Sequence, residues 1–261
     1  ILPPTDPAYE KELEDRIVEA GVSAIASARD AEIGVGTTDV SGLGTNRHDP
    51  AGPSDPQVPV VVARDVSNSK TIAVMAVCTM HPTVLHEDWT LYSGDFPGLA
   101  RKYLQATCLE PDVPFVYHMG ASGNQSPRHV VKGNTIEEAQ RIGTILGQAI
   151  ETLIPTLEFT TDISIQASNQ TIESLPTRVF PNVAEAEKDL ADAAQHLQGL
   201  RDNNAPSTEI RTAECDWFGA EETRTLAKAA EQGRVEAAAA KCLPVEIQLI
   251  RIGDWSFIGW P

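Results

Sequence analysis

The sequence predicts an α/β fold in which a mixed β-sheet is covered by helices on both faces. Amphipathic helical patterns and β-branched runs interleave along the 261 residues, which is typical of helices packed on a sheet. Several predicted strands are joined by short turns, so antiparallel neighbours are expected as well as parallel ones. Hydrophobic residues make up 41% of the chain, which favours a globular protein of one large domain, or at most two.

The first third of the chain predicts a helix followed by strands. Apolar residues recur at helical spacing over about residues 8–28, which indicates an amphipathic helix. These residues are Leu13, Ile17, Val18 and Val22. Residues 31–57 contain five glycines and three prolines and read as short strands joined by turns. The β-branched runs 58–66 and 70–80 are separated only by SNS and predict a hairpin or an adjacent strand pair.

The rest of the chain alternates between the same two patterns. A helix is predicted from Asp95 to about Cys108, and a second one begins at Thr135, which has the capping-box spacing to Glu138. The remaining elements are a strand over 114–120, extended chain over 157–175, charged helices over 182–203 and 219–232, and two strands within 244–261.

Charge and cysteine content exclude several classes of protein. The formal net charge is −17, from 37 acidic and 20 basic residues, so the surface repels phosphate backbones and nucleic acid is excluded as a partner. No apolar run reaches the roughly 20 residues that a membrane-spanning helix needs, and we expect a soluble protein. The four cysteines form no CxxC pair; we expect most of them to be buried and no disulfide scaffold.

The stretch TMHPTVLHEDWTLYSGDFPG, residues 79–98, gathers polar residues where a predicted strand leads into a predicted helix. His81 follows the strand directly and is fixed by Pro82, in the position where α/β proteins usually build their sites. A neutral imidazole is a common zinc ligand, so His81 is the sharpest candidate for a metal ligand. His118 ends a second strand and approaches His81 if the two strands are neighbours. The alternative for each is a histidine that only shapes the backbone.

Other candidates lie in the loops that follow these strands. His86 could add a substrate contact, although loop histidines are more often solvated. Asp95 is a candidate of the same kind, with helix capping as the alternative. GASGNQSPRH, residues 120–129, places Asn124 and Ser126 on a loop of small residues, where backbone N–H groups can face a ligand. This loop does not match the G-x-S-x-G nucleophile elbow, so a serine triad is not supported.

Arg47 lies in the turn-rich segment TNRHDPAGPSDP, residues 45–56. Its guanidinium could bind a carboxylate or polarise a carbonyl oxygen, because its planar fork donates several hydrogen bonds. A surface arginine paired with Asp49 or Asp55 is the ordinary alternative. Composition does not separate the two interpretations.

Four segments of the chain occur in a particular order: NRHDPAGPSDPQV, HPTVLHEDWTLYSGDFPGLARKYL, GNQSP and IRIGDWSFIGWP. Together they resemble the neutral/alkaline non-lysosomal ceramidase family, specifically its amino-terminal catalytic domain. The resemblance spans most of the chain, and its specific parts are the HP…SGDFPG and GNQSP segments.

This resemblance implies a zinc-dependent hydrolase that cleaves the amide bond of an N-acyl compound, ceramide or a related lipid, by means of a zinc-activated water. By motif, His81 matches the histidine ligand that ends the central strand, and Arg47 matches the active-site arginine. Ser126 matches the serine of the loop near the scissile amide, and Asp95 belongs to the matching SGD turn.

The resemblance also places the other zinc ligands outside residues 1–261, in a His-x-His before Ile1 and a Pro-Gly-Glu after Pro261. We therefore expect a single catalytic domain truncated at both ends, in which His81 is the remaining zinc ligand. Because a catalytic zinc needs about three protein ligands, zinc binding is expected to be weak or absent. Family habit and the acidic, lysine-poor surface favour a secreted or periplasmic location, with the cytoplasm as the alternative.

Two other functions stay open at this stage. The scaffold could serve a non-catalytic binding protein, for example for a carbohydrate, in which His81 is a structural turn residue. A zinc esterase is the other alternative, because zinc-bound hydroxide attacks esters and amides alike.

Overall fold

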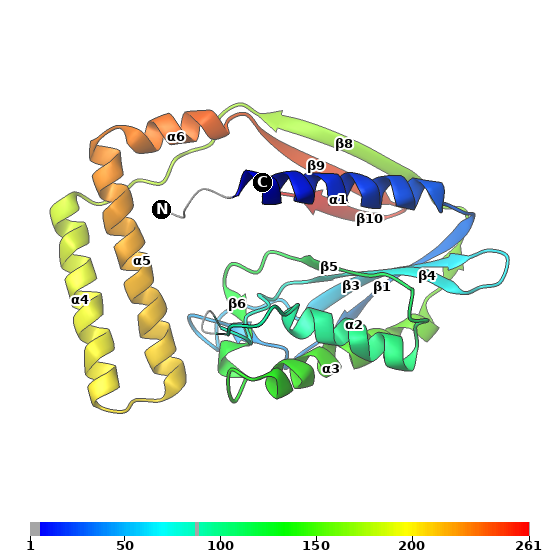
Figure 1. Cartoon of the computed structure of the whole chain (residues 1–261), viewed down its shortest axis with the longest axis horizontal. Helices are drawn as coiled ribbons and strands as arrows, with labels where there is room; N and C mark the ends of the chain where they lie inside the picture. Colours follow the sequence, from blue (N-terminus) through cyan, green and yellow to red (C-terminus); the bar gives the residue numbers. More distant parts are fainter. Residues whose placement is uncertain (1–5, 87–88, 261) are drawn as a thin grey trace.

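The computed structural model describes residues 6–86 and 89–260. Its main sheet has five strands in the order β5-β4-β3-β1-β7 (Figure 1). The strands are β1 (Ala31–Asp39), β3 (Gln57–Asp65), β4 (Thr71–Cys78), β5 (Phe115–Met119) and β7 (Phe159–Thr160). Strand β3 is antiparallel to both β1 and β4, whereas β4 and β5 are parallel, so the sheet is mixed. The predicted α/β class and the predicted β3–β4 pair are confirmed.

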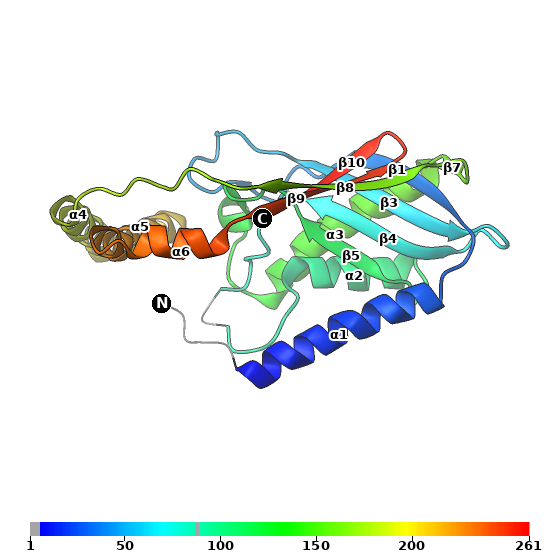
Figure 2. The same cartoon turned by 90° about the horizontal axis from the view of Figure 1, so that it is seen from above.

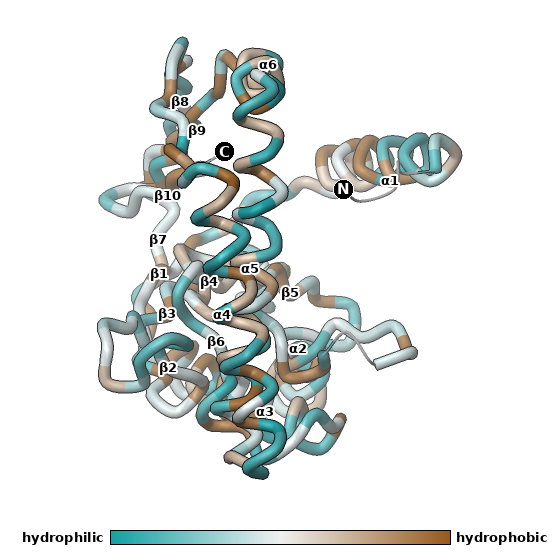
Figure 3. The backbone as a smooth tube through the Cα atoms, turned by 90° about the vertical axis from the view of Figure 1, so that its left-hand side faces the viewer, coloured by the Kyte–Doolittle hydropathy of each residue, from teal (hydrophilic) through white to brown (hydrophobic). Residues whose placement is uncertain are grey.

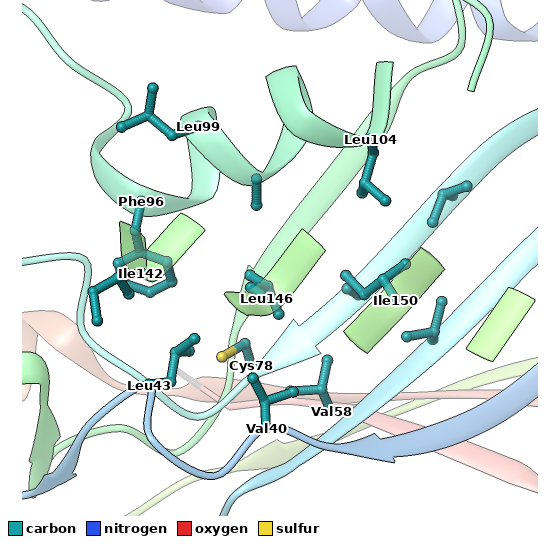
Figure 4. Packing of buried hydrophobic residues seen from close by; sticks show 14 of the residues in the cluster. Val40, Leu43, Val58, Cys78, Phe96, Leu99, Leu104, Ile142, Leu146 and Ile150 are labelled. Atoms are coloured by element: carbon teal, nitrogen blue, oxygen red, sulfur yellow. The ribbon is translucent and has the colours of Figure 1, made fainter. Parts of the chain in front are cut away.

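Two helices, α2 (Asp95–Thr107) and α3 (Ile136–Leu153), cover one face of this sheet (Figure 2). Their apolar stripes meet the inward side chains of β3 and β4 in one cluster, which Figure 4 shows from close by. The largest fully buried side chains from the helices are Phe96, Leu104, Ile142, Leu146 and Ile150. These side chains form the core because two amphipathic helices and one sheet face can exclude water together.

Helix α1 (Pro7–Ala26) does not contribute to this core. Asp6 caps its first turn, since the carboxylate accepts a hydrogen bond from the Ala8 N–H at 2.9 Å. The helix forms close to its predicted bounds, yet none of its residues is buried. Figure 3 shows it standing apart from the sheet, with apolar positions along its length. Within the described chain, buried helical cover is therefore found on one face of the main sheet.

The chain after β7 builds separate elements beside the main sheet. Strands β8 (Ile165–Ile172), β9 (Val245–Ile252) and β10 (Trp255–Gly259) form an antiparallel sheet of their own. Helices α4 (Val183–Asp202) and α5 (Ser207–Glu231) lie side by side as a hairpin, followed by α6 (Arg234–Cys242) (Figure 1). Helix α5 begins well before the predicted residue 219, and α6 was not predicted.

Two expectations about smaller features have different outcomes. The prediction that most cysteines are buried is wrong, because Cys78 is buried whereas Cys108 and Cys242 are exposed. Both exposed thiols lie at helix ends, where an apolar residue is not enclosed. Within residues 6–86 and 89–260, no helix has the length and apolar character needed to cross a membrane. The assignment of residues 1–261 to a single domain stays a prediction.

Candidate active site

A two-stranded ribbon brings several predicted site residues together. Strand β2 (Thr45–Asn46) pairs antiparallel with β6 (Gln125–Ser126). Just beyond the ribbon, the Arg47 N–H donates to the Asn124 carbonyl at 2.7 Å. The His81 N–H donates to the Gln125 carbonyl at 3.1 Å, which adds the end of β4 to the same assembly. We call His81, Arg47, Asn124 and Ser126 the polar cluster.

His81 lies three residues beyond the end of β4, as predicted, and its ring is held by the loop before β6. The Nδ1 atom is 2.8 Å from the Ser122 carbonyl oxygen and 3.2 Å from that of Gln125. Because carbonyl oxygens only accept hydrogen bonds, Nδ1 carries the proton and donates. In the neutral form of the ring, this tautomer has its lone pair on Nε2. Metal-binding histidines commonly have this arrangement, in which a backbone carbonyl fixes the tautomer.

The strand end that leads to His81 is held by a hydrogen bond from the neighbouring strand β5. Tyr117 on β5 donates its hydroxyl to the Met80 carbonyl at 2.9 Å, one residue before His81. Burial raises the pKa of Tyr117 and raises the pKa of the Cys78 thiol to about 11, so both groups are protonated at neutral pH. A neutral phenol can keep donating to this carbonyl, which stabilises the strand end that carries the imidazole.

The main chain of Arg47 is fixed on both sides. Its N–H donates to Asn124, and its carbonyl oxygen accepts from Nη1 of Arg128 and from Nε2 of His129, each at 3.2 Å. Its side chain differs, because the buried Nε–H has no hydrogen-bond partner among the described residues. A buried unpaired donor costs about 1–3 kcal/mol. An acceptor on a bound ligand would remove that cost.

Ser126 and Asn124 lie beside Arg47 with defined partners. Ser126 is buried, and its Oγ accepts a hydrogen bond from the Arg128 N–H at 3.3 Å as the cap of a short 3-10 helix, Pro127–His129. The hydroxyl proton can still be donated to a ligand. Asn124 donates its side-chain amide to the Pro53 carbonyl at 3.2 Å, which ties the loop before β6 to the loop after β2.

Asp95 and His86 are joined to the polar cluster through the loop that follows His81. Asp95 is 6% exposed, and its carboxylate accepts from the Leu85 N–H at 2.8 Å and from the Phe96 N–H at 2.6 Å. Its backbone lies in the left-handed region at φ 50°, which Asp tolerates better than most residues. Asp95 thus anchors the loop on α2. The expectation that Asp95 caps this helix is wrong, because Asp95 is its first residue and the N-cap is Gly94, which has no side-chain hydrogen bond. The His86 N–H donates to Oδ1 of Asn134 at 3.0 Å. Substrate contacts by these two residues stay predictions.

Several positioning residues escaped prediction from the sequence. Asn46 accepts hydrogen bonds from the N–H groups of His48 and Asp49 and so shapes the turn after Arg47. The Gln125 side chain accepts from the Asp55 N–H at 2.8 Å. Asn46 had a usable signal, because Asn before a turn often bonds the backbone two residues on. The loop around Gln125 has no comparable signal.

The described residues do not form a complete metal site. Within residues 6–86 and 89–260, no group of three or more His, Cys, Asp or Glu side chains is placed to hold a metal ion. His118 lies on the neighbouring strand as expected, but it pairs with Val77 rather than with the strand end. His81 has the donor geometry of a zinc ligand, but the described residues place no group of three ligands together, so the predicted zinc does not fit them as a complete ligand set.

A solved ceramidase structure is similar to this chain in fold. A neutral ceramidase from Pseudomonas aeruginosa matches with a TM-score of 0.60 and 17% sequence identity, over 95% of this chain and 42% of that one. A ceramidase complexed with C2 matches with a TM-score of 0.46 and 16% identity, over 56% of this chain and 25% of that one. This chain thus spans less than half the length of either. No protein-family model matches the sequence, and no curated protein matches it significantly.

Proposed function

We propose that the protein is a hydrolase of the ceramidase type that uses zinc to cleave the amide bond of an N-acyl compound, ceramide or a related lipid. The fold supports a ceramidase-like scaffold, since the Pseudomonas aeruginosa neutral ceramidase matches along 95% of this chain. The sequence segments that resemble that family also contribute the residues of the polar cluster. A secreted or periplasmic location belongs to the same proposal.

The observation that carries the proposal is the orientation of His81. Its Nδ1–H bond to the Ser122 carbonyl leaves the Nε2 lone pair available to a metal ion, as in metal-binding histidines. In this proposal His81 is one zinc ligand, and the remaining ligands lie outside the described residues. The roles proposed for Arg47, Ser126 and Asn124 concern the substrate and the main chain, and do not include a bond to the zinc ion.

Arg47 has the clearest role in transition-state stabilisation. Amide hydrolysis develops negative charge on the former carbonyl oxygen, and a guanidinium that stays charged at any working pH stabilises it. The Nε–H, buried and without a partner in the described chain, is a donor that a substrate oxygen could satisfy. Ser126 can donate its hydroxyl proton to the same substrate, and Asn124 holds the Arg47 N–H through its own carbonyl.

The activity test compares an N-acyl sphingosine in mixed micelles with an ester of the same acyl chain. Replacement of Arg47 by Ala is expected to lower kcat about 10²- to 10³-fold, as for other oxyanion donors. Arg16→Ala is the matched control, because Arg16 lies on α1 with 69% of its side chain exposed, and its activity should equal that of the parent protein. Equal activity of the Arg47 variant and the control would refute the role of Arg47.

The zinc test compares two histidines. The full-length protein, with the ligands that the proposal places outside the described residues, is loaded with zinc, washed, and analysed by mass spectrometry for metal content. The His81→Ala variant is compared with His196→Ala, because His196 is exposed on α4. We expect the first substitution to abolish retained zinc and hydrolysis together, and the second to change neither. Undiminished amide hydrolysis in the presence of a chelator would contradict the zinc proposal. Ester cleavage alone would favour the esterase, and ligand binding without turnover would favour a binding protein.

A further inference from the structure

We infer that Arg128 is a positioning residue: it holds the Arg47 main chain in place and is itself anchored on α5, so that the α4–α5 hairpin supports the polar cluster. Arg128 lies in the 3-10 helix that follows β6, directly after Ser126 and Pro127. The expected effect of Arg128 on catalysis rests on the proposed function, whereas the contacts of Arg128 are independent of that function.

The guanidinium of Arg128 joins two regions that are far apart in sequence. On one side, Nη1 donates to the Arg47 carbonyl at 3.2 Å. On the other, Nη1 is 3.3 Å from Oγ1 of Thr212, and Nη2 is 3.2 Å from the Sγ atom of Cys215. Thr212 and Cys215 are three residues apart on α5, so they lie on one face of that helix. The half-buried fork of the arginine fits between this face and the loop.

A second donor makes the arrangement at Arg47 specific. His129 Nε2 lies 3.2 Å from the same carbonyl oxygen, and because that oxygen only accepts, Nε2 carries the proton. One carbonyl oxygen can accept two hydrogen bonds through its two lone pairs. The two peptide groups that flank the Arg47 Cα are therefore both held, one by Asn124 at the Arg47 N–H and the other by Arg128 and His129 at the Arg47 C=O. These hydrogen bonds restrict the backbone of Arg47 and so fix the direction of its Cα–Cβ bond.

The position of this side chain matters because its buried Nε–H is unpaired in the described chain. A displacement of about 1 Å in a catalytic group can cost about 100-fold in rate. Loss of Arg128 would release the Arg47 carbonyl from α5 without removing any group that touches substrate. Arg128 would thus act through Arg47, and the two substitutions should not be additive.

The activity experiment is a double-mutant cycle. Arg128→Ala is expected to lower kcat about 10-fold or more with little change in KM. In an Arg47→Ala background the same substitution should change kcat less than about 2-fold, because the group it positions is gone. Arg128→Lys should recover part of the loss, since an ammonium can reach the carbonyl but cannot span to α5. Equal losses in both backgrounds would overturn the inference.

A second measurement is independent of turnover. Hydrogen–deuterium exchange of the Arg47 amide should become at least about 10-fold faster in Arg128→Ala and in the Thr212→Val, Cys215→Ala double variant. Arg178→Ala is the matched control, because Arg178 donates to Thr223 on the same helix at 3.1 Å but is bonded to no member of the polar cluster. Exchange within α3 should be unchanged in all variants.

The two measurements separate the two proposals. If no amide or ester is hydrolysed but the Arg47 amide responds as expected, the proposed function fails and the inference about Arg128 stands. If the protein is active and Arg47 exchange is unchanged in Arg128→Ala, the inference fails alone. Faster exchange in α3 to the same extent as at Arg47 would also overturn it, since it would indicate general destabilisation.

Discussion

Helices α1 and α3 have similar lengths, 20 and 18 residues, and both show apolar residues at helical spacing, yet only α3 is packed. Six residues of α3 are buried against α2 and the sheet, and none of α1 is. The comparison shows that an amphipathic pattern determines the helix, whereas a complementary surface determines whether the apolar stripe stabilises the fold. The stability of the described chain should therefore be concentrated in the α2–α3 layer and the main sheet.

The largest expected effect comes from the same substitution in the two helices. Leu146→Ala in α3 removes a side chain with no exposed surface and should lower the free energy of unfolding by about 2–5 kcal/mol. Leu13→Ala in α1 removes a side chain that is 47% exposed and should change it by less than about 0.5 kcal/mol. Urea unfolding of both variants gives the answer. Similar losses would mean that α1 is packed as firmly as α3.

The next largest loss of stability is expected at Asp95, which joins the loop after His81 to helix α2. Asp95→Asn keeps a residue that tolerates φ 50° but leaves one amide oxygen where two carboxylate oxygens accept from Leu85 and Phe96. One N–H loses its acceptor, at a cost of about 1–3 kcal/mol. Exchange of the Leu85 and Phe96 amides identifies which one. No loss of stability would mean that Asp95 is free to serve a ligand.

Replacement of a glycine by alanine should lower the stability of the protein when made in α3 and raise it when made in α1. A Cβ at Gly143 would lie 2.7 Å from the Phe96 carbonyl oxygen and 2.9 Å from the Ala100 nitrogen, because α2 and α3 approach closely there. Gly143→Ala should therefore destabilise by about 1–3 kcal/mol. Gly21 in α1 has no atom within 4 Å of such a Cβ, so Gly21→Ala should stabilise by about 0.5–1 kcal/mol. Thermal unfolding measures both, and equal signs would remove the distinction between the helices.

The elements predicted well from sequence are those specified by local signals. The start of α3 followed from a cap and apolar spacing, since the Thr135 side chain accepts from the Glu138 N–H, whereas the start of α5 and the whole of α6 did not follow in this way. The β3–β4 pair followed from two β-branched runs and a short turn. The pairing of β8 with β9 could not be predicted, because α4, α5 and α6 separate these strands in sequence and no local pattern encodes such a partner.

The same limit applies to the polar cluster. His81 was found because a strand end and a proline mark its position, and its placement after β4 agrees with the prediction. The β2–β6 ribbon has two residues in each strand, which is too short to show a period of two. Arg128 carried no signal either, since its acceptors on α5 become neighbours only in the folded chain.

The smallest expected difference in stability comes from the charge pairs of the two helices, and this difference depends on pH. In the first turn of α3, Glu138 accepts from Arg141 and from the Lys132 N–H, which lowers the pKa of its carboxyl from 4.5 to about 2. Because this pKa is lower in the folded than in the unfolded state, the ionised carboxylate stabilises the fold at pH values above about 4.5. This stabilisation is lost as pH falls from about 4.5 towards 2. The parent protein should thus exceed Glu138→Gln in free energy of unfolding at pH 7, and this gap should narrow between pH 5 and pH 3 in urea unfolding.

The Lys11–Asp15 pair of α1 has both side chains largely exposed, so Asp15→Asn should show almost no gap to the parent protein at any pH. A gap at Glu138 that stays constant down to pH 3 would mean that packing of the side chain, and not its charge, stabilises the start of α3.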